Sequence, residues 1–162
     1  MFNVFNLLLD IYYIRSKFNG VLLKTKYFNK KNKELTQDIV GNPFSFFQAL
    51  KMKGIVSKRL VINDVSPNME QYMNKTSDIN YANIELRPKG IIIHINKGLK
   101  NFTWIIPFYQ LVVFKTNGSS IHAQGKFIHF RNTITFKENR SFFRKLLDAK
   151  VEYELTYNTQ PY

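Results

Sequence analysis

Apolar and polar positions alternate along residues 84–131 in short runs that turn-forming residues separate. Alternation with a period of two is typical of strands with one buried face. The turn signals are Pro88-Lys89-Gly90, Asn117-Gly118 and Gln124-Gly125, and the asparagine–glycine pair is a strong hairpin signal. We therefore predict strands over 84–87, 90–96, 102–106, 108–116, 119–124 and 126–131.

A two-residue turn at Asn117-Gly118 would set the register of the next strands. It pairs Phe114 with Ile121, and the following hairpin pairs Ile121 with Ile128. One face then carries side chains suited to a barrel interior: Val112, Phe114, Ile121, Ala123, Ile128 and Phe130. The other face is also partly apolar, and we expect the N-terminal helices or a partner to cover part of it: Leu111, Val113, His122, Phe127, His129 and Arg131.

An amphipathic helix is predicted directly after these strands. Thr135 and Glu138 have the spacing of a capping box, and Asn139 and Ser141 are later alternatives for the start. The apolar stripe of the helix consists of Phe142, Phe143, Leu146 and Leu147.

The first eighteen residues have the pattern of a helix with one narrow polar stripe and a very wide apolar face. Such a face must be covered by the domain, by another subunit or by a membrane interface. The candidates for contact with a partner are Phe2, Phe5, Leu8 and Tyr12.

A second helix is predicted over residues 33–53, interrupted near Gly41, with Asn42 capping its second part. Residues 55–62 favour a strand, and residues 63–78 read as an irregular linker. The predicted organisation is a helical segment over 1–54, a strand and linker over 55–79, a strand-rich core with its helix over 80–150, and a tail over 151–162.

Length and composition fit one buried domain with an appendage. The chain has 162 residues and no cysteine, which excludes disulfides and thiolate chemistry. No signal peptide is apparent, and no apolar run reaches the roughly 18 residues that a membrane-spanning helix needs. We expect a cytoplasmic protein that is at most peripheral to a membrane.

The formal net charge of +13 attracts anionic partners, although a basic surface also serves solubility. Cations at the predicted strand turns are the candidates for binding an anionic ligand or membrane surface: Arg87, Lys89, Lys97 and Lys100.

Catalytic patterns are not visible in the sequence. The eleven acidic residues are scattered, and the seven glycines lack the spacing of a phosphate-binding loop. His122 and His129 fall on one predicted face, with His94 as a third candidate, but zinc sites usually need three or four protein ligands. We predict a protein that is not an enzyme and that holds no metal and no cofactor.

A glycine turn at Gly90 leads into a strand, and the step Trp104-Ile105-Ile106-Pro107 leads into the next. With the closing helix, this order resembles the pleckstrin-homology-like (PH-like) superfold, including its bacterial branch, over roughly residues 80–150. The resemblance implies an α+β fold: an antiparallel β-barrel of six to seven strands closed by the C-terminal helix, here preceded by an N-terminal helical segment. Members of this superfold bind phosphoinositides, peptides or protein partners.

Taken together, these patterns predict a non-enzymatic binding or scaffolding module. Its expected partner is a protein, a second copy of the chain or an anionic membrane surface. The alternative is nucleic-acid binding, because basic and aromatic side chains interleave on a strand as they do in single-strand binders: Lys126, Phe127, His129 and Arg131.

Overall fold

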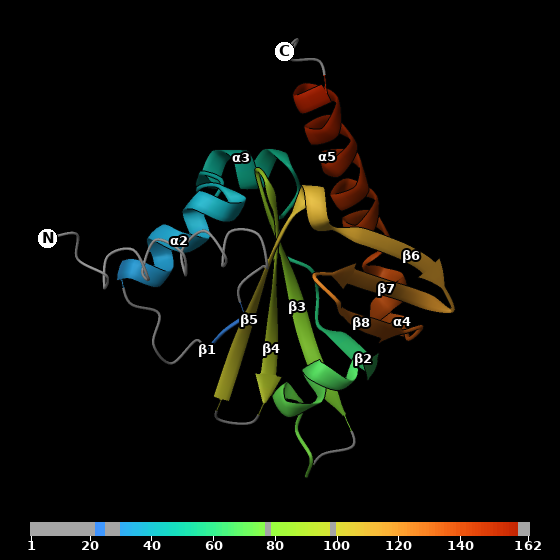
Figure 1. Cartoon of the computed structure of the whole chain (residues 1–162). Coiled ribbons are helices and arrows are strands. Elements are labelled where there is room, and N and C mark those ends of the chain that lie inside the picture. Colours follow the sequence, from blue (N-terminus) through green and yellow to red (C-terminus); the bar gives the residue numbers. More distant parts are fainter. Residues whose placement is uncertain (1–21, 25–29, 77–78, 98–99, 159–162) are drawn as a thin grey trace, which may run out of the picture.

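The computed structural model describes residues 22–24, 30–76, 79–97 and 100–158 (Figure 1). The protein has an α+β fold built on one antiparallel sheet. Its seven longer strands are β2 (Leu60–Val65), β3 (Asn80–Arg87), β4 (Gly90–Lys97), β5 (Lys100–Pro107), β6 (Val112–Thr116), β7 (Gly118–Ala123) and β8 (Lys126–Arg131). The short β1 (Leu22–Lys24) adds an eighth strand beside β5, giving the order β1-β5-β4-β3-β2-β8-β7-β6.

Two consecutive meanders make up this sheet. β2 to β5 form the first meander, β6 to β8 form the second, and pairing of β2 with β8 joins them. Figure 1 shows the strands of the two meanders crossing at a steep angle. The indole Nε1 of Trp104, on β5, donates a 2.9 Å hydrogen bond to Oε1 of Gln124, between β7 and β8. The sheet therefore folds over and encloses a core between its halves.

The predicted closure into a barrel is not seen among the described residues. β6 and β1 stand at the two ends of the strand order, and neither pairs with the other. β1 already pairs with the outer edge of β5, and η3 (Phe108–Gln110) separates β5 from β6. The sheet is therefore curved but open.

The helix α5 (Arg140–Asn158) packs on this core, as predicted. Phe142, Phe143 and Leu146 are buried in the same hydrophobic cluster as the inner residues of both meanders, and Leu147 is half-buried beside them. The helix is longer than predicted, since the segment interpreted as a tail is helical as far as Asn158.

The predicted cap at Thr135 was wrong, whereas the alternative start at Asn139 is confirmed, because α5 begins directly after this residue. A separate short helix, α4 (Ile134–Glu138), comes first and is capped by Thr133, whose Oγ1 accepts a 3.2 Å hydrogen bond from the backbone N–H of Phe136. The amide of the buried Asn139, between α4 and α5, then contacts the segment that precedes β2: its Oδ1 accepts a 2.8 Å hydrogen bond from the N–H of Lys58.

The register predicted for β6 was wrong by one residue. Thr116 pairs with Gly118, so that Asn117 alone forms the turn and Phe114 pairs with Ser120. A slip of one residue turns every side chain to the other face of a strand. Phe114 and Val112 are consequently about half exposed, whereas the predicted pairing of Ile121 with Ile128 is confirmed in the core.

The N-terminal part also differs in detail from the prediction. α2 (Lys30–Val40) and α3 (Phe46–Lys51) are separate helices, and the N-cap of α3 is Ser45, not Asn42. α2 covers the outer face of the first meander, where Ile39 and Val40 pack on β4 and β5. The prediction placed the N-terminal helices, or a partner, on the second meander, but α2 packs on the first.

The segment before the core is more ordered than a linker. The strand predicted over 55–62 begins only at Leu60, although Val56 forms an isolated bridge with Glu85. The short helix η2 (Pro67–Tyr72) lies within the predicted linker and contributes Met69 to the core. None of the helices described is long and apolar enough to cross a membrane.

Candidate functional site: a cationic pocket beside an open strand edge

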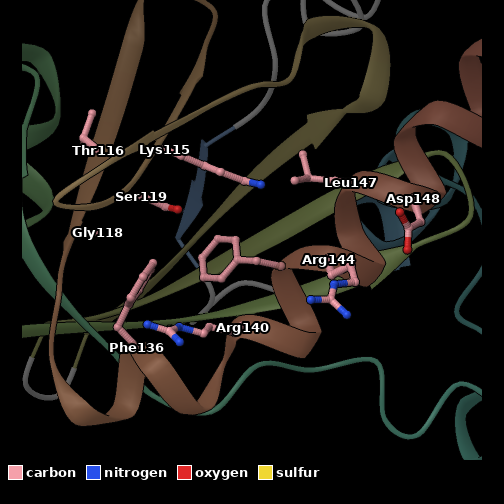
Figure 2. A pocket seen from close by; sticks show the side chains of 10 residues that line it. Lys115, Thr116, Gly118, Ser119, Phe136, Arg140, Arg144, Leu147 and Asp148 are labelled. Atoms are coloured by element: carbon pink, nitrogen blue, oxygen red, sulfur yellow. The ribbon is translucent and has the colours of Figure 1, made fainter.

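A pocket of about 490 Å³ lies between the β6–β7 hairpin and the helices α4 and α5. Figure 2 shows Lys115 reaching from the hairpin towards α5, from which Arg140 and Arg144 project. The pocket is lined by Lys115, Thr116, Gly118, Ser119, Phe136, Arg140, Phe143, Arg144, Leu147 and Asp148.

Local geometry explains why these side chains meet. Arg140 and Arg144 are four residues apart on α5 and therefore neighbours on one side of the helix. Lys115 pairs with Ser119 across the hairpin, which places both side chains on the face that looks towards α5. Beneath them, the rings of Phe136 and Phe143 pack with their centroids 5.3 Å apart.

The chemistry of the pocket suits an amphipathic anion. Among the described residues that line it, three exposed cations face one carboxylate, that of Asp148, over an apolar floor of two phenylalanines and a leucine. Arginine binds carboxylate and phosphate groups through two parallel N–H donors. Among the residues described as lining this pocket, no histidine or cysteine stands beside the Ser119 hydroxyl to activate it as a nucleophile.

The pocket adjoins an open edge of the sheet. β6 pairs with β7 on one side, and no further strand of the described residues pairs on its other side. Natural edge strands are usually protected by charges, bulges or covering loops. Here Val112 and Phe114 are 47% and 52% exposed on the edge strand itself. Such an edge can accept an additional strand from another chain.

The four predicted anion-binding residues do not form one site. Arg87 and Lys89 lie at the β3–β4 turn, whereas Lys97 and Lys100 pair with each other at the opposite end of β4. The Nζ of Lys97 donates a 2.6 Å hydrogen bond to the carbonyl oxygen of Gln71. The side chain of Lys100 lies outside the described part of the molecule.

Arg87 is engaged within the protein. Its Nε forms an ion pair with Oε1 of Glu85 at 2.6 Å, although the angle is not that of a hydrogen bond. The second carboxylate oxygen of Glu85, Oε2, lies 3.0 Å from Nε2 of His94. Burial raises the pKa of Glu85, but the His94 hydrogen bond and the Arg87 charge outweigh it, so the pKa is lowered overall. Glu85, Arg87 and His94 therefore contact one another within the protein.

The nucleic-acid candidates divide between two faces. Phe127, His129 and Arg131 share the outer face of β8, whereas Lys126 alternates with them and lies on the opposite face. The rings of Phe127 and His122 are stacked with centroids 5.3 Å apart. Burial lowers the pKa of His122, which favours its neutral form.

Two of these outer-face residues have internal partners. Nδ1 of His129 lies 3.3 Å from Nδ2 of Asn63, and Nε of Arg131 donates a 3.2 Å hydrogen bond to Oδ1 of the same asparagine. In the part of the chain that the structure describes, no three histidine, cysteine, aspartate or glutamate side chains are grouped so as to hold a metal ion. The candidates Phe2, Phe5, Leu8 and Tyr12, with the predicted helix over 1–18, lie outside the described residues.

The residues of the pocket were not identified as a site from the sequence. The spacing of Arg140 and Arg144 was a visible signal, but it also fits an ordinary solvated helix face. Lys115 joins them only because the β6–β7 turn has a single residue. The two-residue turn predicted from asparagine–glycine would have turned the Lys115 side chain to the opposite face of β6. Comparison with family models, with curated proteins and with solved structures found no match.

Proposed function

We propose that this protein is a non-enzymatic binding module with a PH-like architecture. The succession of a four-stranded meander, a three-stranded meander and a C-terminal helix packed on the core supports the proposal. Its ligand is an extended protein segment that carries acidic side chains. The segment adds as a strand to the outer edge of β6 and places a carboxylate among Lys115, Arg140 and Arg144.

The observation that carries this proposal is the adjacency of edge and pocket. Lys115 and Thr116 belong both to the edge strand and to the pocket lining. A strand added to an edge gains main-chain hydrogen bonds that are independent of sequence, whereas side-chain pockets supply specificity. The three cations would select acidic segments, and the apolar floor would take an adjacent apolar side chain.

A binding measurement with a defined peptide tests the proposal. The probe is a fluorescein-labelled peptide of alternating valine and glutamate, and the control peptide carries lysine in place of glutamate. We expect the acidic peptide alone to bind, with amide NMR shifts centred on β6. Arg144→Glu should weaken binding about tenfold or more. The equal charge change Lys137→Glu should not, because Lys137 is exposed on α4 and does not line the pocket. Equal effects of the two variants would show attraction by net charge alone and refute the site.

Single-stranded nucleic acid is a second candidate ligand. It is favoured by one observation: Phe114, His122 and Phe127 form a row of contacting rings on the outer face of the second meander. Bases stack on such rings at about 1–3 kcal/mol each. Short oligothymidine titrated at rising salt tests this candidate, since neutralised phosphates make affinity fall steeply with salt. Phe127→Ala should abolish that binding and leave peptide binding intact.

A further inference from the structure

The short helix α3 turns its largest apolar side chains away from the protein. Phe46, Phe47 and Leu50 are 76%, 80% and 66% exposed, and no residue of the helix is buried. Exposed apolar side chains scattered singly are ordinary on protein surfaces, but three on six consecutive residues form a local patch.

The protein holds this helix firmly in place. Ser45 and Gln48 form a reciprocal capping box, in which the N–H of Ser45 donates a 2.8 Å hydrogen bond to Oε1 of Gln48. On either side of the helix, Phe44 and Met52 pack against the main core. After it, the Nζ of Lys145 donates a 2.5 Å hydrogen bond to the carbonyl oxygen of Gly54. The patch is therefore displayed by an anchored element.

The chain segment that carries the patch has charges of one sign. Between Asp38 and Asp64 the sequence has four cations and no acidic residue. Two of the cations have partners elsewhere, since Lys58 is paired with Glu138 and Arg59 lies over the Tyr81 ring. Lys51 and Lys53, both exposed, remain beside the patch.

We propose that α3 docks on an anionic membrane surface. Phe46, Phe47 and Leu50 enter the boundary between lipid headgroups and acyl chains, and Lys51 and Lys53 lie at the level of the lipid phosphates. Apolar insertion combined with nearby lysines is the arrangement by which interfacial helices bind anionic lipid. The lysine stems can cover apolar surface while their ammonium groups stay in water.

Charge complementarity favours lipid over a second copy of the chain. A twofold contact uses the same patch on both subunits, so it would bring the lysines of the two copies together without an acidic residue from the segment to offset them. The helix α3 also lies away from β6 in Figure 1, so that this inference is independent of the proposed peptide site.

Vesicle co-sedimentation of the full chain tests the proposal. The probes are vesicles of phosphatidylcholine alone and of phosphatidylcholine with an equal part of phosphatidylglycerol. The variant Phe46→Ser/Phe47→Ser should reduce the affinity for anionic vesicles about tenfold or more. The matched control is Ile134→Ser on α4, because Ile134 is also 76% exposed and should be without effect.

Four outcomes would overturn the proposal. Equal binding of wild type and the double variant, with both released by salt, would mean adsorption through net charge alone. Equal affinity for both kinds of vesicle would remove the anionic requirement. A loss of thermal stability in the double variant would mean that another part of the chain covers the patch. A change in its mass in solution would assign the patch to contact between copies.

Discussion

Gly118 and Gly125 both have positive φ, at +115° and +68°, but their surroundings differ. A Cβ at Gly118 would stand 2.0 Å from the carbonyl oxygen of Phe130, whereas at Gly125 nothing lies within 4 Å. Only at Gly118 is the absence of a side chain needed for the close approach of β7 and β8.

We therefore expect the two alanine substitutions to differ in cost. Gly125→Ala should lower the free energy of unfolding by about 1 kcal/mol, the cost of a left-handed conformation for a residue with Cβ. Gly118→Ala adds a steric clash with backbone and should cost about 3 kcal/mol or more. Urea denaturation of both variants measures this, and equal costs would contradict the geometry given for the β6–β7 turn.

The lowered pKa of Glu85, a second effect of a single residue, makes the free energy of unfolding depend on pH. Because the folded pKa is below the ordinary value of 4.5, the carboxylate stabilises the fold above that value and loses its contribution as the pH falls through the folded pKa. At neutral pH, Glu85→Gln should destabilise the protein by roughly 1.5–3 kcal/mol, the range for hydrogen bonds to charged groups. In urea denaturation the difference from wild type should shrink on acidification below pH 4.5. A difference that is constant with pH would show that charge plays no part.

At the scale of elements, α5 has two parts with different roles. Leu146, in its first half, is fully buried in the core, whereas Leu155, near its end, is 62% exposed. Figure 1 shows the end of the helix projecting beyond the sheet. The first half therefore supplies fully buried core residues, whereas the second half combines the exposed Leu155 with Tyr153, whose ring packs against the buried Phe108 with centroids 5.5 Å apart.

Truncation of these two leucines should separate the roles. Leu146→Ala should cost about 2–5 kcal/mol, because it leaves a cavity in the core. Leu155→Ala, the matched control, should change stability by less than about 0.5 kcal/mol. Thermal unfolding followed by circular dichroism measures both, and a large loss for Leu155→Ala would indicate that the end of α5 is covered.

The elements themselves were predictable where pattern decides them. Period-two alternation located the core strands, and the stripe at Phe142, Phe143 and Leu146 correctly identified the packed face of α5. The helix starts were predicted wrongly because several nearby residues can cap a helix. Asn42 and Thr135 can accept the same capping hydrogen bond as Ser45 and Thr133, which are the caps in the structure. The hairpin register failed because the sequence does not show that β7 passes so close to β8 at Gly118. The pocket depended on that register and could not be predicted without it.

At the scale of the whole molecule, the two meanders are joined through one core. They share a single hydrophobic cluster, the pairing of β2 with β8, and the hydrogen bond from Trp104 to Gln124. We expect urea unfolding to be two-state, so that fluorescence of Trp104, the sole tryptophan, and far-UV circular dichroism give coincident transitions. Separate midpoints would show that the meanders unfold independently.

The position of β2 in the middle of the sheet has a consequence for biosynthesis. The ribosome delivers β2 early, but the strand that covers its second edge, β8, emerges only after five other strands. Until then, that edge of β2 is open to pairing with neighbouring nascent chains. Contacts between residues so distant in the chain also form slowly. We therefore expect mispairing between nascent chains to be most frequent in this period of synthesis, before β8 arrives.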